Sequence, residues 1–167
     1  MEFYNVIQTR WSVRKYRSEP VPDEILERVL NAARIAPTAA NRQPFHLVVV
    51  KDPQKYLSGR VRQSWILDAP IVIVAFSDGE KAWVREWDNE NFAAVDVTIA
   101  LDHLILAATA EGLGTCWIAA NDPSKLEELL PADQKLKFVA LTPIGYAAKE
   151  PSAKVRKELS ELITTLK

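Results

Sequence analysis

Polar and apolar side chains alternate in the segment Arg10-Trp11-Ser12-Val13-Arg14 near the N-terminus, and the two outer residues are basic. If this segment is extended, Arg10, Ser12 and Arg14 lie on one face, because successive side chains of a strand point to opposite sides. Two guanidinium groups with a hydroxyl between them can hold a phosphate through charge-assisted hydrogen bonds. A short basic run is more often a solvated surface, so the segment on its own leaves both interpretations open.

A second basic pair, Lys154 and Arg156, has the same alternate spacing near the C-terminus. The chain of 167 residues has a formal net charge of -1, which gives no overall positive field for nucleic acid. We therefore expect no nucleic-acid partner. Two local basic clusters in such a chain indicate that its two ends converge on one small anion.

Gly112 and Gly114 form a Gly-x-Gly pair, but Trp117 stands where a dinucleotide-binding fingerprint has its third glycine. The pair also follows a predicted helix and precedes a predicted strand, which is the reverse of the order in that fingerprint. We interpret the two glycines as a helix stop followed by close backbone packing.

Cys116 is the one cysteine of the chain, so no internal disulfide can form, and this fits a cytoplasmic protein. Paired with His103 it would be a candidate nucleophile, but no third group suggests itself that would orient such a pair. We interpret Cys116 as a buried structural thiol. With two histidines in the chain, we expect no metal site of the Cys/His kind.

Hydrophobic periodicity and turn residues predict a single α+β domain over residues 1–167, without the regular alternation of a doubly wound sheet. The predicted helices are residues 2–9, 22–36, about 53–61, 88–111 and 122–130. The predicted strands are residues 45–50, 70–76, a short one within 114–118, and 138–146. The strand over 70–76 is apolar on both faces, which is typical of a buried strand.

The longest apolar stretch runs from Phe92 to Ala110 and is interrupted by Asp96, Asp102 and His103. Because of these polar residues, we expect a buried helix and no membrane span. The N-terminal residues show no secretory signal pattern. Apolar residues spread widely around the helix axis, so the helix needs cover on several sides. In a domain of this size, a partner subunit is a natural source of that cover.

Five segments in this order make the chain resemble the FMN-dependent nitroreductase family over nearly its whole length, as a small single-domain member: TRWSVRKY, APTAANRQPFHLVVV, APIVIV, GLGTCWIAA and PIGYAAKEPSAKVR. The resemblance implies a mixed, mainly antiparallel sheet flanked by helices. It also implies an intertwined homodimer with two FMN molecules at the interface. The C-terminal tail, about residues 149–167, would reach the partner subunit.

The same resemblance implies roles for individual residues. Arg10, Ser12 and Arg14 would approach the phosphate, the ribityl chain and the pyrimidine edge of the flavin. The neighbouring Trp11 stands where many members have a second arginine. Lys154 and Arg156 would complete the phosphate site, and backbone amides around Ala119 and Ala120 would reach flavin N5. A segment of the other subunit would pack on the isoalloxazine ring: Pro37, Thr38, Ala39, Ala40, Asn41 and Gln43.

Other positions depart from the family pattern. Thr38 stands where serine is common, and Arg62 stands where larger members often have asparagine. The segment 77–91 is short compared with members that carry an extra helical excursion over the flavin. Within it, Trp83 and Trp87 are four residues apart and are candidates for lining a pocket.

The activity implied by the resemblance is that of an FMN-dependent oxidoreductase. Hydride would pass from NADH or NADPH to the flavin and then to a small acceptor such as a nitroaromatic or a quinone, in a ping-pong cycle. No catalytic side chain is expected, since the flavin performs the redox chemistry. Two alternatives remain: a branch with other flavin chemistry, either reductive dehalogenation or flavin breakdown, and a non-enzymatic FMN-binding module.

Overall fold

The computed structural model describes residues 2–131, 134–151 and 154–166. A sheet in the strand order β1-β2-β4-β3 has antiparallel pairing throughout and consists of β1 (Phe45–Val50), β2 (Ile71–Ser77), β4 (Lys137–Gly145) and β3 (Gly114–Thr115). A parallel bridge between Ser12 and Thr115 adds the N-terminal segment beside β3. The predicted α+β class and the mixed, mainly antiparallel sheet are thereby confirmed.

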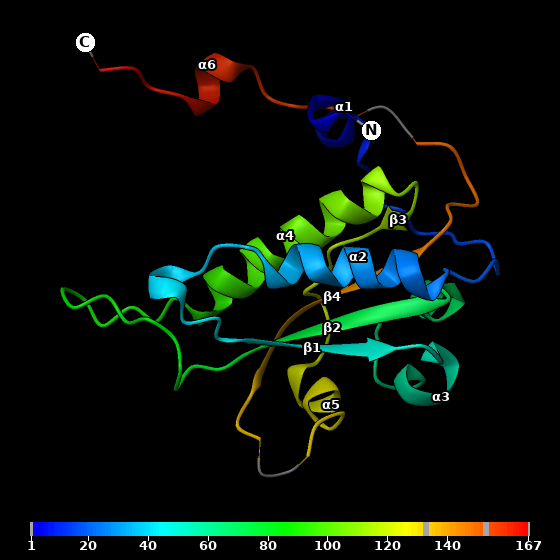
Figure 1. Ribbon diagram of the computed structural model, residues 1–167, viewed down its shortest axis with the longest axis horizontal. Coiled ribbons are helices and arrows are strands. Elements are labelled where there is room, and N and C mark those ends of the chain that lie inside the picture. Colours follow the sequence, from blue (N-terminus) through cyan, green and yellow to red (C-terminus); the bar gives the residue numbers. More distant parts are fainter. Residues whose placement is uncertain (1, 132–133, 152–153, 167) are drawn as a thin grey trace.

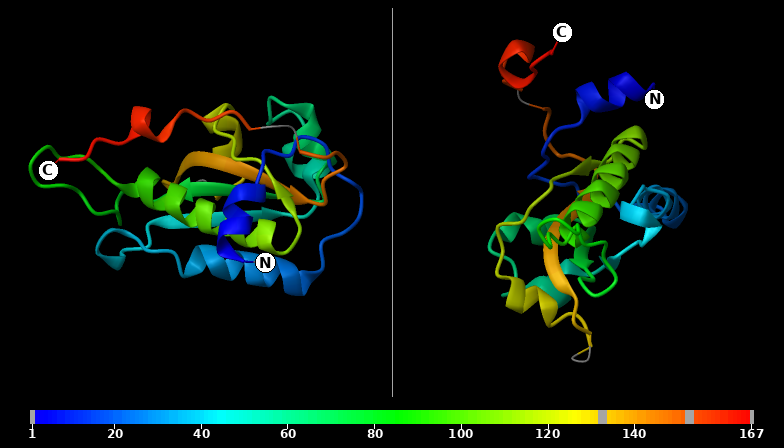
Figure 2. Two further views of the ribbon diagram at one scale, coloured as in Figure 1. Left: turned by 90° about the horizontal axis from the view of Figure 1, so that it is seen from above. Right: turned by 90° about the vertical axis from the view of Figure 1, so that its left-hand side faces the viewer.

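Helices cover both faces of this sheet (Figure 1 and Figure 2). One face carries α2 (Asp23–Arg34) and α4 (Ala93–Ala110), and the other carries α3 (Pro53–Leu57), α5 (Pro123–Glu127) and the 3-10 turn η2 (Ser64–Asp68). The central strand β2 lies between these layers and every one of its residues is buried. Its predicted burial on both faces is therefore confirmed.

The helix α2 begins where the sequence predicts it. Pro22 occupies the N-cap position, and Asp23 and Glu24 in the first turn complement the partial positive charge of the helix start. The buried residues Leu26 and Val29 of α2 face the sheet and α4 in the larger of the core clusters. Burial of this apolar stripe is what holds α2 on the sheet.

The long helix α4 is shorter at its start than the predicted 88–111. Residues 84–91 form a turn instead, in which Arg85 pairs with Asp88 and Asn89 has a φ of 58°. Phe92 is the N-cap residue, and Asn91 just before it accepts a hydrogen bond from the Ala93 N–H at 3.0 Å at the helix start. Local side-chain bonds of Asp and Asn compete with helix formation, and here they delay it by one turn.

The end of α4 agrees with the predicted helix stop. Gly112 has a φ of +79°, in the left-handed region that glycine adopts without steric cost. The Leu113 N–H then reaches back to the Ala108 carbonyl at 2.8 Å, as in a Schellman motif.

By length and apolar composition, α4 alone among the described helices would suit a membrane span, yet it packs against α2, α1 (Phe3–Thr9) and the sheet. Its buried residues include Val97, Leu101 and Leu104 of the main core cluster. The prediction of a buried helix is confirmed.

The predicted tryptophan pair is separated by the turn before α4. Trp83 packs edge-on against Phe92, with ring centroids 5.2 Å apart. Trp87 is 87% exposed, and the lining of a pocket by the two tryptophans stays a prediction. The spacing of four residues would align the two rings only on a helix, and residues 83–87 are not helical.

The shorter elements differ from prediction mainly at their ends. α3 ends at Leu57 and α5 at Glu127, each earlier than predicted, and each starts at a proline after an aspartate N-cap. The strand after Gly114 pairs with β4 for two residues only, and pairing resumes at a single bridge between Ile118 and Leu141.

The C-terminal tail leaves the body of the domain. Figure 1 and Figure 2 show it passing beyond α4, next to α1, with the one-turn helix α6 (Leu159–Leu162) near its end. Val155, Leu159 and Leu162 are all at least 65% exposed. Contact of this tail with a partner subunit stays a prediction, as does the single-domain organisation over 1–167.

Candidate functional site

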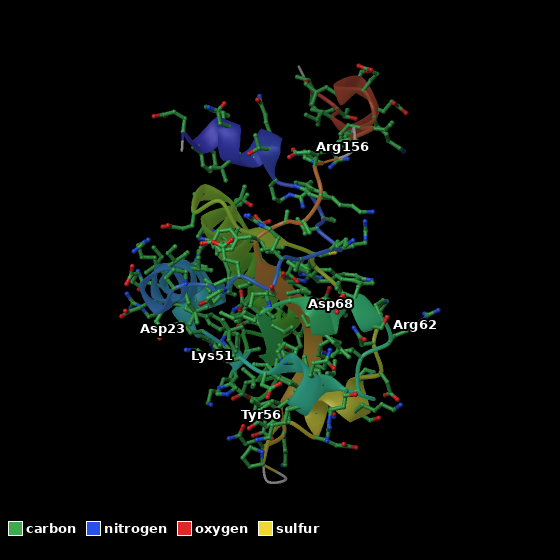
Figure 3. The ribbon with its side chains drawn as sticks, turned by 90° about the vertical axis from the view of Figure 1, so that its right-hand side faces the viewer. Asp23, Lys51, Tyr56, Arg62, Asp68 and Arg156 are labelled. Carbon is green, nitrogen blue, oxygen red and sulfur yellow. The ribbon has the colours of Figure 1, made fainter. Side chains whose placement is uncertain are left out.

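Basic residues from the two ends of the chain meet. The Lys154 ammonium donates a hydrogen bond to the backbone carbonyl of Gln8 in α1. The pKa of Lys154 is lowered from its ordinary value by burial and by the like charges of Arg10 and Arg156. Figure 3 labels Arg156, which lies in the tail just before the C-terminal helix α6. Basic residues of the two chain ends therefore lie near one another, and their convergence on one small anion stays a prediction.

The segment that carries Arg10 is extended, as predicted. The Val13 N–H donates to the Thr115 carbonyl at 2.8 Å, which holds the segment along β3. Val13 is fully buried and shares its cluster with the half-buried Trp11, whereas Arg14 is exposed. Apolar and basic side chains thus point to opposite sides. A place for Trp11 in the site stays a prediction.

Gly114 makes the close approach of this segment to β3 possible. A Cβ atom at residue 114 would lie 2.5 Å from Val13 Cγ2, a distance that real Cβ contacts essentially never show. The predicted close backbone packing is confirmed at this position. The second glycine of the pair therefore positions the residues on either side of Val13.

Cys116 lies behind the basic segment. It is 4% exposed, and burial raises the pKa of its thiol, opposed by the charges of Arg14 and Arg10 and a hydrogen bond with Ser12. Within the described residues no hydrogen bond joins it to His103, so the structure supports a buried thiol and gives no nucleophile pair. Its proximity to Ser12 and Arg14 was not foreseen from the sequence.

The loop after α2 has an unusual backbone. Ala40, Asn41 and Gln43 have φ values of 50°, 53° and 50°, in the left-handed region, around the 3-10 turn η1 (Ala39–Asn41). The loop is held by a hydrogen bond from the Gln43 N–H to Thr38 Oγ1 at 3.0 Å and by one from the Asn41 N–H to the Thr38 carbonyl at 2.9 Å. Such strain persists where surrounding bonds fix it, and it is concentrated at ligand-binding sites.

Asp96 anchors this loop from α4. One carboxylate oxygen accepts the Ala39 N–H at 2.9 Å, and the side chain is 2% exposed. The other oxygen is buried without a hydrogen-bond partner among the described residues. Sequence reasoning missed this role, although a carboxylate at helical spacing within a buried apolar stripe is a signal that could have revealed it.

The two predicted parts of the flavin site lie at opposite ends of α4. The loop over 37–43 contacts α4 at Asp96, and the segment over 10–14 contacts β3, which follows the other end of α4 (Figure 1). From Asp96 to Ala110 the helix rises about 20 Å, at about 1.5 Å per residue. A single chain therefore does not bring these segments together.

The turn after β3 presents free backbone donors. Ala119 and Ala120 are exposed, and in the described part of the chain neither N–H donates a hydrogen bond to protein. The turn is fixed on one side by the pair of hydrogen bonds between Ile118 and Leu141, each 2.9 Å. Rigid, unpaired amides of this kind suit an acceptor atom of a bound ligand.

Comparison with known proteins identifies the family. The model of the Nitroreductase family matches residues 7–57 and 52–146. A nitroreductase family protein of Clostridium difficile 630 is 35% identical in sequence, with a TM-score of 0.89 over 99% of this chain and 100% of that one. A Desulfovibrio desulfuricans protein described as a nitroreductase, solved in complex with FMN, is 26% identical, with a TM-score of 0.82 over 100% and 98% of the two chains.

Curated relatives carry two kinds of name. The NADH dehydrogenase of Thermus thermophilus is 31% identical, over 84% of each chain. Human iodotyrosine deiodinase 1 is 30% identical, over 99% of this chain and 68% of its own length. The family model spans most of the chain and the fold matches throughout, so this protein belongs to the nitroreductase family.

Proposed function

We propose that this protein is an FMN-dependent oxidoreductase that takes hydride from NADH or NADPH and reduces a small acceptor such as a nitroaromatic or a quinone. The observation that carries the proposal is the meeting of Arg10, Lys154 and Arg156 beside the extended segment that holds Ser12 and Arg14. Family membership and the FMN complex of the Desulfovibrio desulfuricans relative support it. A cytoplasmic location stays part of this proposal.

The residues present fit the phosphate of FMN. A phosphate monoester carries a charge of about -1.5 to -2 near neutral pH and forms strong hydrogen bonds with guanidinium groups. The pKa of Lys154 is lowered first by desolvation and then by the like charges of Arg10 and Arg156, whose effect such an anion would offset. Arg10, Lys154 and Arg156 would hold the phosphate in this proposal.

The remaining predicted residues suit the flavin ring. The free N–H groups of Ala119 and Ala120 can donate to a ring nitrogen, and Arg14 offers a positive charge that favours negative charge on a bound ligand. FMN supplies the redox chemistry when bound, by accepting a hydride and passing electrons on to the acceptor in a ping-pong cycle. The protein's part is to bind and orient both molecules.

We infer that the working unit is a homodimer in which both chains line each flavin. The separation of the loop 37–43 from the segment 10–14 along α4 supports this inference, since a second copy would supply the missing half of each site. Exposed apolar residues on α1 and on the tail offer surface for the interface, among them Phe3, Tyr4, Ile7, Leu159 and Ile163.

The visible spectrum of the purified protein tests the cofactor. We expect a yellow protein that releases FMN and not FAD, because the basic cluster suits a monophosphate and the chain has no glycine-rich pyrophosphate loop. A colourless protein that also fails to take up added FMN would overturn the proposal. Turnover of NADH or NADPH with a quinone then distinguishes an enzyme from an FMN-binding module.

A second candidate is reductive dehalogenation, which is favoured by the similarity to human iodotyrosine deiodinase 1. The experiment compares iodotyrosine with a nitroaromatic as acceptor at equal concentrations. Release of iodide faster than nitroaromatic reduction would favour this candidate. Progressive loss of the bound flavin's own absorption in oxygen would instead indicate flavin breakdown.

A further inference from the structure

A cationic pocket lies beside the Ala119–Ala120 turn, apart from the basic cluster at the chain ends. Its volume is about 520 Å³. The lining residues are Gly59, Arg60, Val61, Arg62, Ala120, Asn121, Asp122 and Lys125. In Figure 3, Arg62 lies at the right-hand edge of the molecule and Arg156 at the top, so this pocket and the proposed phosphate site of FMN are separate.

The walls of this pocket are fixed to each other. The Arg62 N–H donates to Asn121 Oδ1 at 2.8 Å, and Gln63 Nε2 donates to the Ala120 carbonyl at 3.4 Å. These bonds join the segment that follows α3 to the turn that precedes α5. A group bound in the pocket therefore has a defined position relative to the free amides of that turn.

Positive charge exceeds negative charge in the pocket. Arg60 is paired with Glu128 at 3.2 Å, and the Asp122 carboxylate already accepts two hydrogen bonds from Ser124, although Lys125 also acts on it electrostatically. Neither Arg62 nor Lys125 is within ion-pair distance of a carboxylate in the described ranges.

Unsatisfied donors accompany these charges. Arg60 Nε and Asn121 Nδ2 are buried and have no hydrogen-bond acceptor among the described residues. Gln63 Oε1, an acceptor on the same wall, is likewise buried without a partner, so these enclosed atoms do not by themselves select the charge of a ligand. Arg62 and Lys125 are both exposed and outside ion-pair distance of the described carboxylates, and with Asp122 as the one acidic lining residue they leave a net positive charge that suits an anion with several oxygen atoms.

We propose that this pocket binds the pyrophosphate of NADH or NADPH, with Arg62 and Lys125 as its charge partners. This inference rests on the proposed function. A nicotinamide ring that delivers hydride must reach the flavin near the Ala119–Ala120 turn, and its pyrophosphate lies one ribose away from that ring. Uncharged quinones and nitroaromatics carry no comparable anion, so the pocket serves the hydride donor.

The test uses the full chain loaded with FMN and the variants Arg62→Gln, Lys125→Gln and their combination. Lys51→Gln is the matched control, because it removes the same charge on the opposite side of the molecule (Figure 3). Isothermal titration calorimetry measures the Kd of ADP-ribose, which carries the pyrophosphate without the nicotinamide. Each single pocket variant is expected to raise this Kd about tenfold, as for one lost charge-assisted hydrogen bond.

In steady-state kinetics the pocket variants should raise the KM for NADH and leave the KM for an uncharged benzoquinone unchanged. Absence of ADP-ribose binding by the unsubstituted protein, or an unchanged Kd in the double variant, would overturn the inference. A rise in KM for the acceptor alone would assign the pocket to acceptors and overturn it as well. Failure of the proposed function can be told apart from failure of this inference, because FMN binding is measured from the visible spectrum before any ADP-ribose is added.

Discussion

Lys154 lies within reach of the like charges of Arg10 and Arg156, and no carboxylate among the described residues forms an ion pair with any of the three. Keeping like charges together costs free energy, and such clusters are retained where a ligand of opposite charge compensates them. At the scale of single residues, the cluster and the buried Asp96 are the groups whose arrangement is hardest to explain by stability alone.

Arg10→Ala and Arg156→Ala are each expected to weaken FMN binding, because each removes a charged hydrogen bond worth about 1.5 to 3 kcal/mol. Lys154→Ala should weaken FMN binding less than either arginine variant. An ammonium acts as a point charge, and the ammonium of Lys154 already donates a hydrogen bond to the Gln8 carbonyl. Fluorescence titration with FMN measures all three. Unchanged affinity in both arginine variants would place the phosphate elsewhere.

Asp96→Ala is expected to raise the Kd for FMN about tenfold, because the Ala39 N–H loses its charged acceptor and the strained loop relaxes. The Kd of Asp96→Asn for FMN should lie between those of the unsubstituted protein and Asp96→Ala, since the asparagine amide oxygen can still accept a hydrogen bond from the Ala39 N–H. Asp102→Ala, exposed on the same helix, is the control. Thermal unfolding of each FMN-free variant separates a loop effect from loss of fold, and wild-type affinity in Asp96→Ala would contradict the assigned role.

Among the elements, those with a strong period and clear end signals are the ones that the sequence predicts well. α2 combines an apolar stripe with Pro22 and two acids, and β1 and β2 are runs of β-branched residues, so local preference and tertiary packing agree. The start of α4 was missed because the side chains of Asp88 and Asn91 form local hydrogen bonds that helical periodicity does not report.

In the candidate site too, features set by neighbouring residues could be predicted from the sequence, whereas contacts between distant segments could not. The alternation of Arg10, Ser12 and Arg14 could be read directly, whereas the pairing of Ala39 with Asp96 joins residues far apart in the chain. The apolar stripe around Asp96 is a local signal that its carboxylate is buried, but no local pattern identifies Ala39 as its partner. The pocket around Arg62 was missed for the same reason, since its walls come from two segments that only the fold brings together.

Gly114→Ala is expected to weaken FMN binding by displacing the segment 10–14, since the new methyl group would overlap Val13. Destabilisation of about 1 to 3 kcal/mol is expected, as for other overpacked positions. Gly79→Ala is the matched control, because the new Cβ atom would lie 3.8 Å from its nearest neighbour, Asn91 Nδ2. Urea unfolding and FMN titration measure the two effects, and full FMN affinity in Gly114→Ala would show that the close approach is not required.

In the whole molecule, the strained loop 37–43 and the basic segment 10–14 lie at the two ends of α4. With the proposed site residues, a monomer would bind a flavin with only one of these segments. The proposed intertwined pair of chains would resolve the separation without moving either segment, and it would also cover the exposed apolar side chains of α1 and of the tail.

Mixing an Arg10→Ala chain with an Asn41→Ala chain tests this relation, once each homodimer has been shown to bind FMN poorly. In a mixed dimer, one interface site combines both defects and the other has neither. About half of the heterodimer's sites should therefore recover FMN, as measured by flavin absorbance per chain. A monodisperse FMN-loaded monomer would defeat the idea, and a mixed dimer without recovery would mean that both segments serve the same chain's flavin.

The attachment of the tail has a consequence for the lifetime of the protein. Across residues 154–166, the hydrogen bond from Lys154 to Gln8 is the one that ties the described tail to the rest of the chain. Lys154, Arg156 and Lys157 are also cleavage sites for trypsin-like proteases. A phosphate bound at this cluster would cover Lys154 and Arg156, so trypsin should cleave at these two residues much faster in FMN-free protein than in loaded protein. Supply of the cofactor would then set how long each copy survives.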